Sequence, residues 1–375
     1  MQILVVGGGI QGLATATALA REGHLVQVVE RERPGSRASW VAAGLLTPSS
    51  PWKYPQGLIA LCHASEAMYG DYVADLIEHT GIDPEYENEG MLYPVGLGFG
   101  VDEMEVCTRR RNELGFEVKH LDRAALDALQ PGLGPAVESA AWQPHSARIR
   151  SPRLVAAVLK RALQCGVDVI SECPVVSLVS SAGRVTGVRL STGQELEAEC
   201  VVLSAGAWSG ELADSIGLQI DVRPVRGQIL LLRGAVGSLA ATVNDGDCYL
   251  VPRRDGRILV GSTMEDAGFN AVTDREALSR LHALAAQLLP ATLDMEVETA
   301  WAGLRPGTPD RLPYIGAVPE LPGLVLATGH FRNGILLAPI TARLVTDVVA
   351  GRTPCMDIAA YAPRPIDSER ALLAG

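Results

Sequence analysis

The sequence contains no C-x-x-C pair and no group of cysteine and histidine residues at the spacing of a zinc site. Its seven cysteines are scattered along the chain, and an odd number without a pattern is typical of reduced thiols in a cytoplasmic protein. We therefore expect a cytoplasmic protein that has neither a disulfide framework nor a bound metal ion.

Long hydrophobic runs and an excess of positive charge are also missing. No apolar run approaches the roughly 20 residues that a membrane-spanning helix needs, so no integral membrane segment is predicted. The apolar N-terminus lacks the basic leading region of a signal peptide. The net charge of −11 argues against nucleic acid or an anionic membrane as the main partner. Small anionic substrates are still allowed, because they respond to local arginines.

The clearest motif of the chain lies between Met1 and Glu30. Residues 3–6 form a short apolar run that is typical of a buried parallel strand. Gly7, Gly9 and Gly12 then follow the G-x-G-x-x-G spacing, and an alanine-rich helix is predicted to begin near Ile10. The first glycine would make the tight turn, the second would admit a pyrophosphate, and the third would let the helix pack closely. Glu30 ends the second strand about 20 residues on, where an acidic residue binds a ribose hydroxyl. Together these features predict a dinucleotide site, without separating FAD from NAD.

The rest of the chain divides into two kinds of segment. A length of 375 residues with 47% hydrophobic residues predicts a globular protein of two domains. Residues 39–45 are small and apolar, which suits either another close-packed helix start or backbone that passes close to a flat cofactor. Helices are expected at 58–79, 101–115, 122–129, 151–165, 273–289 and 335–349, with Ser151 as a helix cap. Strands are expected at 25–30, 167–170, 175–178, 185–190, 195–197, 200–203, 228–232, 247–251, 257–261 and 324–327.

This order predicts an α/β fold of two interleaved domains. A Rossmann-like cofactor domain would take residues 1–46, 146–220 and 302–375. An α+β substrate domain with an antiparallel sheet would take residues 47–145 and 221–301.

Three stretches of the sequence resemble the D-amino-acid oxidase family of FAD enzymes, and within it the glycine oxidase branch of the thiamine pathway. They are Gly7–Gly12 with Glu30, residues 301–308 (Trp-Ala-Gly-Leu-Arg-Pro-Gly-Thr), and residues 329–339 (Gly-His-Phe-Arg-Asn-Gly-Ile-Leu-Leu-Ala-Pro). The resemblance runs over essentially the whole chain and implies FAD as the cofactor. It also implies a homo-oligomer, a tetramer in the family. Relatives that tether flavin use a cysteine in their C-terminal part, and residues 301–316 contain none, so we expect non-covalent FAD.

The resemblance also assigns site residues. Cofactor contacts match Ile10, Gln11, Glu30, Arg31, Ser39, Ala43, Gly44, Leu45, Val175, His330, Phe331, Arg332, Asn333, Gly334, Ile335 and Leu336. Substrate contacts match Tyr249, Arg305 and Arg332. Many relatives carry a histidine two residues before the tyrosine, where this chain has Asp247.

The chemistry of amine oxidation gives some of these side chains a role. The flavin carries the redox step, so the protein must mainly hold the substrate with its α-C–H facing the flavin. A guanidinium can grip a carboxylate at two points, and Arg305, in what reads as a loop flanked by glycine and proline, is our choice for that role. The alternative for Arg305 is a structural salt bridge.

The other candidates are less distinct. Tyr249 suits a hydroxyl donor to the same carboxylate and a core tyrosine equally well, and Met264 suits a pocket wall or the core. A helix from Gly334 would aim its N-terminus at the flavin. His330 is expected to pack against the cofactor rather than to act as a base.

We expect hydride transfer from a neutral amine to FAD and reoxidation by O2, which gives H2O2. Glycine would yield an imine that hydrolyses to glyoxylate and ammonia, and the thiamine pathway would use the imine itself. The alternatives are a D-amino-acid dehydrogenase that reduces a quinone and a protein that only binds a dinucleotide.

Overall fold

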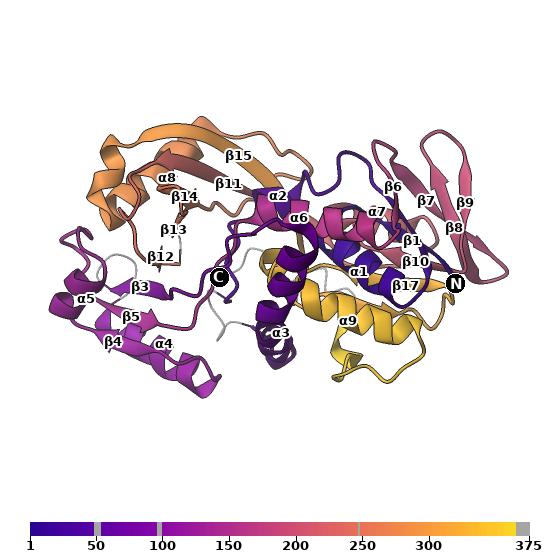
Figure 1. Ribbon diagram of the computed structural model, residues 1–375, viewed down its shortest axis with the longest axis horizontal. Helices are drawn as coiled ribbons and strands as arrows, with labels where there is room; N and C mark the ends of the chain where they lie inside the picture. The colour runs from indigo at the N-terminus through magenta and orange to yellow at the C-terminus, as the bar shows by residue number, and fades with distance from the viewer. Residues whose placement is uncertain (49–53, 96–99, 247, 365–375) are drawn as a thin grey trace.

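The computed structural model describes residues 1–48, 54–95, 100–246 and 248–364. Two sheets lie side by side along the long axis of the molecule, with helix α3 (Gln56–Thr80) between them (Figure 1). Each sheet draws its strands from separate parts of the chain.

The first sheet has six strands in the order β16-β17-β10-β1-β2-β6, and all neighbours are parallel except β16 and β17. Its four central strands are mostly apolar and buried, as a parallel sheet covered on both sides requires. Leu4 and Val6 face the small sheet β7-β8-β9, whereas Ile3 and Val5 face helices α1, α6 and α9. The strands are β1 (Gln2–Val6), β2 (Leu25–Val29), β6 (Asp168–Ile170), β10 (Cys200–Leu203), β16 (Tyr314–Ala317) and β17 (Leu324–Thr328), and the small sheet is β7 (Val175–Ser181), β8 (Arg184–Leu190) and β9 (Glu195–Glu197).

The second sheet has eight strands in the order β15-β11-β14-β13-β12-β3-β5-β4, all antiparallel to their neighbours except β12 and β3. Helix α8 (Arg275–Leu288) packs its apolar side on this sheet, with Asp274 as its cap. The strands are β3 (Met91–Val95), β4 (Lys119–Leu121), β5 (Ser139–Gln143), β11 (Arg223–Arg233), β12 (Thr242–Asn244), β13 (Tyr249–Pro252), β14 (Arg257–Gly261) and β15 (Glu296–Gly307).

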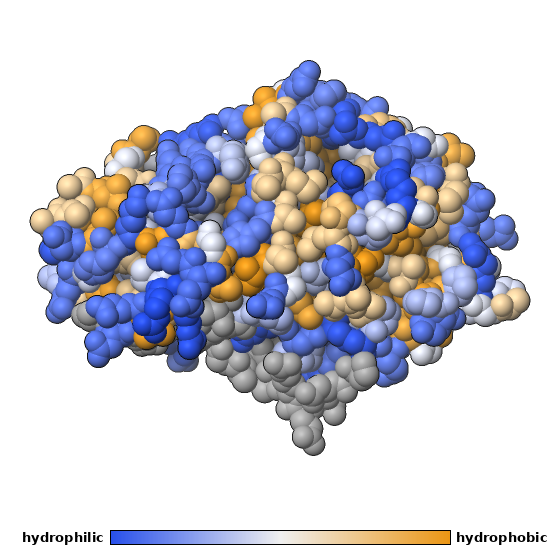
Figure 2. Space-filling model, turned by 90° about the horizontal axis from the view of Figure 1, so that it is seen from below, coloured by the Kyte–Doolittle hydropathy of each residue, from blue (hydrophilic) through white to orange (hydrophobic). Residues whose placement is uncertain are grey.

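The remaining helices connect or cover these sheets. They are α1 (Ile10–Arg21), α2 (Ala38–Val41), α4 (Val101–Glu113), α5 (Arg123–Leu129), α6 (Ser151–Gln164), α7 (Ser209–Asp214) and α9 (Ala338–Val349), with 3-10 turns η2 (Gly206–Trp208), η3 (Pro290–Asp294), η4 (Phe331–Asn333) and η5 (Ala359–Tyr361). None of the helices within the described ranges is long and apolar enough to cross a membrane. Hydrophilic residues are distributed across the face that Figure 2 shows, with hydrophobic residues exposed between them.

Most expected elements are present, and four expectations were wrong. Residues 91–143 supply three strands to the second sheet, where only helices were expected. Residues 301–307 belong to strand β15 rather than to a loop, because β15 is an edge strand and tolerates Pro306 there. The last long helix begins at Ala338, after a series of turns, and not at residue 335. Ser151 is the first helical residue of α6 and Arg150 is its cap.

The division into two interleaved domains stays a prediction. The six-stranded sheet uses only strands from the three segments assigned to the cofactor domain, and the eight-stranded sheet uses strands from the other two. Strand β15, however, runs without interruption across the predicted boundary between residues 301 and 302.

Candidate functional site

A cavity of about 540 Å³ lies where the two sheets meet. One side is formed by the loops that follow β1, β2, β10 and β17, at the carboxyl ends of the first sheet. The other side is formed by β11, β13 and β15 of the second sheet. Crevices outside the carboxyl ends of parallel strands are the usual ligand sites of such sheets.

The glycine turn after β1 is built for close approach. Gly7 has a φ of +110°, and a Cβ there would lie 2.8 Å from the carbonyl carbon of Ser204. A Cβ at Gly12 would overlap the carbonyl oxygen of Gly7, so helix α1 packs against the turn only because residue 12 is glycine. A Cβ at Gly9 would lie 3.2 Å from Ser39 Oγ, so any side chain at residue 9 would fill part of the space beside the turn. The geometry supports the roles expected for Gly7 and Gly12, and the contact of Gly9 with a pyrophosphate stays a prediction.

Glu30 lies at the end of β2 with both carboxylate oxygens fixed. Oε2 accepts a hydrogen bond of 2.6 Å from the Gly8 N–H, and Oε1 accepts one of 2.9 Å from the Glu32 N–H. The side chain is buried and lines the cavity. This arrangement holds a carboxylate where a ribose hydroxyl could donate to it.

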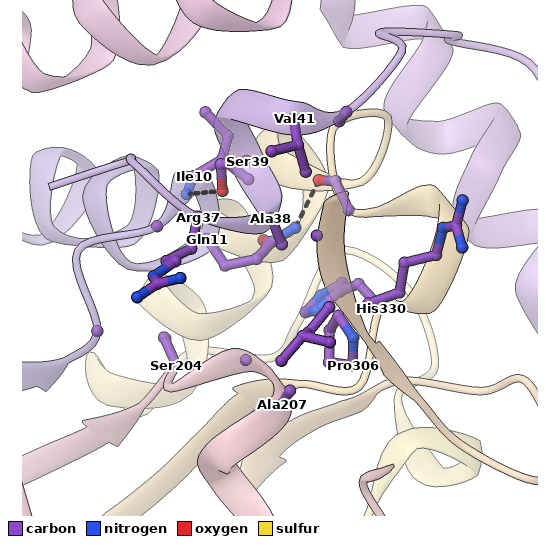
Figure 3. A pocket seen from close by; sticks show the side chains of 18 of the residues that line it. Ile10, Gln11, Arg37, Ala38, Ser39, Val41, Ser204, Ala207, Pro306 and His330 are labelled. Atoms are coloured by element: carbon purple, nitrogen blue, oxygen red, sulfur yellow. Dashed lines mark hydrogen bonds between the residues drawn. The ribbon is translucent and has the colours of Figure 1, made fainter. Parts of the chain in front are cut away.

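The N-terminus of α1 is joined to two distant segments, as Figure 3 shows. Ser39 Oγ accepts a hydrogen bond of 2.9 Å from the Ile10 N–H. Gln11 Nε2 donates to the Gly334 carbonyl at 2.7 Å, whereas its Oε1 is buried without a partner among the described residues. These bonds bring residues 39 and 334 to the helix end that is suited to bind phosphate.

The segment from Val41 to Leu45 forms one wall of the cavity. Trp301 Nε1 donates to the Val41 carbonyl at 3.2 Å. Arg253 Nη2 donates to the Ala43 carbonyl at 2.8 Å, and burial lowers the pKa of this arginine to about 10. After the single turn of α2, this backbone is therefore fixed along the cavity, which favours the cofactor wall over a longer helix.

A second wall is the turn that follows β17. Tyr69 donates from its hydroxyl to the Ile335 carbonyl at 2.8 Å, and Ser65 donates to the Leu336 carbonyl at 2.6 Å, so helix α3 holds this turn. His330 is buried and its Nε2 lies 3.0 Å from Thr341 Oγ1. Burial lowers the pKa of His330 to about 3, so the ring is neutral near pH 7, and its packing against the cofactor stays a prediction.

Arg305 projects from β15 into the cavity and is held by neutral groups. Its Nη2 donates to Ser262 Oγ at 2.6 Å, and its Nη1 donates to the Thr263 carbonyl at 3.0 Å. No carboxylate of the described residues lies within ion-pair distance of the guanidinium. Burial lowers its pKa to about 10, partly offset by the nearby Tyr249, so the side chain keeps its charge near neutral pH. A partly desolvated positive charge without a carboxylate has a free-energy cost that a ligand carboxylate would reduce.

Two glycines create the space for this guanidinium. Gly227 of β11 and Gly303 of β15 are directly paired, so a Cβ on either would point to the same face. A Cβ at Gly227 would overlap the guanidinium of Arg305, and a Cβ at Gly303 would overlap the side chain of Val41. The absence of side chains at these two glycines therefore leaves space for the guanidinium of Arg305 and for Val41 of α2.

The other substrate candidates lie at different depths. Tyr249 is 7% exposed and lines the cavity beside Arg305. Arg332 also lines the cavity, is half-buried, and its positive charge lowers the pKa of Arg305. Met264 is 41% exposed and is not among the lining residues, so it belongs neither to the pocket wall nor to the core. Asp247 lies outside the described residues.

Most of the cofactor candidates meet in this one cavity. The cavity is lined by Gly7, Gly9, Ile10, Gln11, Glu30, Arg31, Ser39, Ala43, Gly44, Leu45, Val175, His330, Phe331, Arg332, Asn333, Gly334 and Ile335. Gly12 and Leu336 do not line the cavity. Gly12 packs against the turn at Gly7, and the Leu336 carbonyl accepts the hydrogen bond from Ser65 of α3.

Four further residues were missed at the sequence level. Gly227, Arg253, Ser204 and Arg37 each line the cavity or fix its wall. Ser204 and Gly227 had a signal, since Ser204 directly follows a buried parallel strand and a glycine inside a strand often marks a close approach. Nothing in the sequence marks Arg253 or Arg37.

The residues present fit a dinucleotide cofactor. The cavity joins a helix N-terminus and a fixed carboxylate to an apolar wall, and two buried polar atoms, Gln11 Oε1 and Ser204 Oγ, still lack partners among the described residues. The sequence matches the DAO family, described as FAD dependent oxidoreductase, over residues 2–348. The chain belongs to this family. Its cofactor is FAD, and the family expected from the three motifs is confirmed.

Individual relatives agree with this assignment. The chain is 40% identical over 364 residues to a glycine oxidase of Pseudomonas aeruginosa, which covers 96% of this chain and 98% of the relative. It is 34% identical over 377 residues to the bifunctional protein ThiO/ThiG of Synechocystis, covering 96% of this chain and 53% of that longer protein. Among solved structures, the crystal structure of a glycine oxidase from Geobacillus kaustophilus matches with a TM-score of 0.91 and 31% identity, over 96% of this chain and 98% of the other.

Proposed function

We propose that this FAD enzyme oxidises glycine and other small amines or D-amino acids. The observation that carries the proposal is Arg305, a half-buried guanidinium in the cofactor cavity with no carboxylate partner among the described residues. A free amino acid brings the missing carboxylate, and its two oxygens match the two terminal nitrogens of a guanidinium.

The surroundings of Arg305 support a single orientation for that carboxylate. Ser262 and Thr263 accept hydrogen bonds from the guanidinium, and the backbone of Gly227 lies against it. Tyr249 lies close enough to add a hydroxyl donor to the same carboxylate. Arg332 adds a second positive charge on the opposite wall, in the turn after β17. Such a grip would fix the α-carbon at one distance from the cofactor, which is the main demand of this reaction.

Bound FAD supplies the two-electron acceptor that amine oxidation needs. The residues of the chain would bind the carboxylate, orient the α-carbon and exclude water. His330 is buried and neutral, with its Nε2 beside Thr341, so we assign no general base to the site.

The products follow from the balance of the reaction. Glycine, O2 and water would give glyoxylate, ammonia and H2O2, with the imine as the first product. Relatives named glycine oxidase and ThiO/ThiG support a role in supplying the glycine imine for the thiazole of thiamine.

Anaerobic mixing tests the proposal. Glycine, small amines and D-amino acids, added in turn to the purified protein without O2, should bleach the flavin absorbance, and air should restore it with release of H2O2. Bleaching that O2 does not reverse, but a quinone does, would show a dehydrogenase instead. A protein that no member of the panel bleaches would only bind the dinucleotide.

A further inference from the structure

We propose that Thr47, Glu66 and His63 form a proton relay that carries the ammonium proton of the substrate from the cavity to solvent. The inference rests on the proposed function, because a bound amino acid is the source of the proton. An amino acid is protonated at nitrogen near neutral pH, whereas its oxidation needs the neutral amine. Water is a weak base and takes an ammonium proton slowly, so a more basic acceptor behind the cavity wall would speed this step.

Thr47 is the member of the relay that reaches the cavity. Leu45 and Thr47 both line it, whereas Leu46 between them is buried in the core on the helix side of the first sheet. Leu45 also packs against the apolar cluster that contains Tyr249, one of the substrate candidates. Thr47 therefore lies toward the substrate end of the cavity, with its side chain against the space that a substrate amine would enter.

Glu66 lies behind this wall on helix α3, which runs between the two sheets (Figure 1). It does not line the cavity, so the cavity itself still contains no general base. Burial raises the pKa of Glu66, and hydrogen bonds from His63 and from the hydroxyl of Thr47 oppose that rise. A carboxylate with a raised pKa is a better proton acceptor near neutral pH than an ordinary one.

The contacts of His63 leave one proton to be shared between its ring and Glu66. Nε2 lies 2.7 Å from the Leu114 carbonyl oxygen, which can only accept, so Nε2 carries a hydrogen. Nδ1 lies 3.3 Å from Glu66 Oε2, and a hydrogen bond there needs one further proton, on the ring or on the carboxyl group. Hydrogen bonding to Glu66 accordingly raises the pKa of His63. The pair holds this proton in either of two forms, an ion pair or two neutral groups.

The imidazole ring connects the pair to solvent. The side chain of His63 is 37% exposed, and Phe116 packs on its ring with the centroids 4.5 Å apart. The hydroxyl of Thr47 accepts the ammonium proton and passes its own proton to Glu66. His63 releases its Nδ1 proton to water, and the proton on Glu66 then moves to Nδ1. One proton enters and one leaves, no electrons are transferred, and the pair returns to its first state.

The neighbouring ionisable groups of the described structure do not compete for this proton. Cys62 of α3, Tyr86 and Tyr93 of β3 all interact with the charge of Glu66. Burial raises the pKa of all three, so they are neutral near pH 7 and neither take up nor supply a proton there. Among the described residues, His63 is the only ion-pair partner of Glu66.

The dependence of the reaction on pH tests the relay. Thr47→Val and Glu66→Gln each interrupt it with little change of side-chain shape. Anaerobic flavin reduction by glycine, followed by stopped-flow absorbance, should be about tenfold slower near neutral pH in both variants. The difference should shrink to about twofold or less above the pKa of the free amine, where glycine arrives neutral and needs no acceptor. His63→Gln should show the same recovery at high pH.

A second pair of a histidine and a carboxylate on the same helix provides the control. His79 Nδ1 lies 3.6 Å from Asp75 Oδ1 and neither residue lines the cavity, so His79→Gln should react at the wild-type rate at every pH. FAD content and the affinity for a simple carboxylate without an amine should be unchanged in all variants. In holoprotein with labelled histidines, NMR titration should show that Glu66→Gln lowers the pKa of His63.

Wild-type rates near neutral pH in Thr47→Val or Glu66→Gln would overturn the relay and leave the oxidation of glycine intact. Losses that are equal at all pH values would also overturn it, because they would indicate a purely structural pair. An unchanged pKa of His63 in Glu66→Gln would show that the two groups share no proton. A wild-type flavin that no amine reduces at any pH would instead contradict the proposed function, and the relay with it.

Discussion

Replacing Gly227 by alanine should damage substrate binding without removing any polar group. The guanidinium of Arg305 lies directly on Gly227, and a Cβ at residue 227 would overlap its carbon and both terminal nitrogens. Gly227 has no left-handed backbone conformation, so the new methyl group acts only through its volume. The guanidinium must therefore move away from its place above β11.

The size of the effect follows from that displacement. Non-bonded carbon atoms prefer separations of about 3.5–4.0 Å, so relief of the overlap requires a shift of about 1 Å or more. Such a misplacement of a binding group costs about 10² in rate, which corresponds to about 2.7 kcal/mol. The shift also strains the bonds of Arg305 to Ser262 and Thr263, whose present lengths are 2.6 and 3.0 Å. We therefore expect kcat/KM for glycine to fall about 100-fold.

The assay compares glycine with an amine that lacks a carboxylate, using H2O2 release to obtain kcat/KM. Gly227→Ala should lower the value for glycine much more than the value for the simple amine. The double variant with Arg305→Ala should be no worse than Arg305→Ala alone, because both act through one guanidinium. Gly70→Ala is the control, since Gly70 lies in α3 and a Cβ added there would meet no described atom within 4 Å. Wild-type kinetics in Gly227→Ala, or equal losses for both amines, would refute the reasoning.

Three other predictions follow from the site. Arg305→Ala should remove about 3–5 kcal/mol of substrate stabilisation, or about 10² to 10³ or more in kcat/KM for glycine, with FAD content unchanged, and Arg305→Lys should recover only part. Equal loss of stability and flavin in Arg305→Ala would instead indicate a structural role. No cysteine lines the described cavity, so heat denaturation should release FAD into the supernatant, and flavin retained in the precipitate would contradict non-covalent binding. The folded pKa of His330, about 3, lies below its unfolded value of about 6.5, so only the unfolded state takes up a proton between these values. The free energy of unfolding should fall as the pH drops below 6.5, by up to about 1.4 kcal/mol per pH unit. In His330→Gln, the free energy of unfolding measured by chemical denaturation should depend less steeply on pH.

Local patterns were sufficient for the first thirty residues of the cofactor side. The glycine turn, Glu30 and the strand before each of them all lie between Gln2 and Glu30, and their spacing alone fixes a strand–turn–helix unit. The expectations drawn from the cysteines and the net charge rest on composition alone and not on tertiary contacts.

The substrate side was harder to predict because its strands pair over long distances. Strand β3 lies beside β12, which comes much later in the chain. The pattern of residues 91–95 does not predict that pairing. Strand β15 was taken for a loop because glycine and proline interrupt its pattern. Its position at the edge of the sheet, which makes Pro306 acceptable, exists only in the folded state.

The position of Arg305 illustrates what no single stretch of sequence contains. The resemblance to the family singled out this arginine as a carboxylate anchor, but its geometry depends on the register between β11 and β15. That register pairs Gly227 with Gly303 and places the guanidinium diagonally over Gly227. A slip of β11 by one residue would turn Gly227 to the opposite face and place a neighbouring side chain where the guanidinium now lies. The position of the guanidinium thus depends on the pairing of β11 with β15 and on the lack of a side chain at Gly227. Gly227→Ala changes that position alone, so it is a sharper test of the site than removal of the arginine.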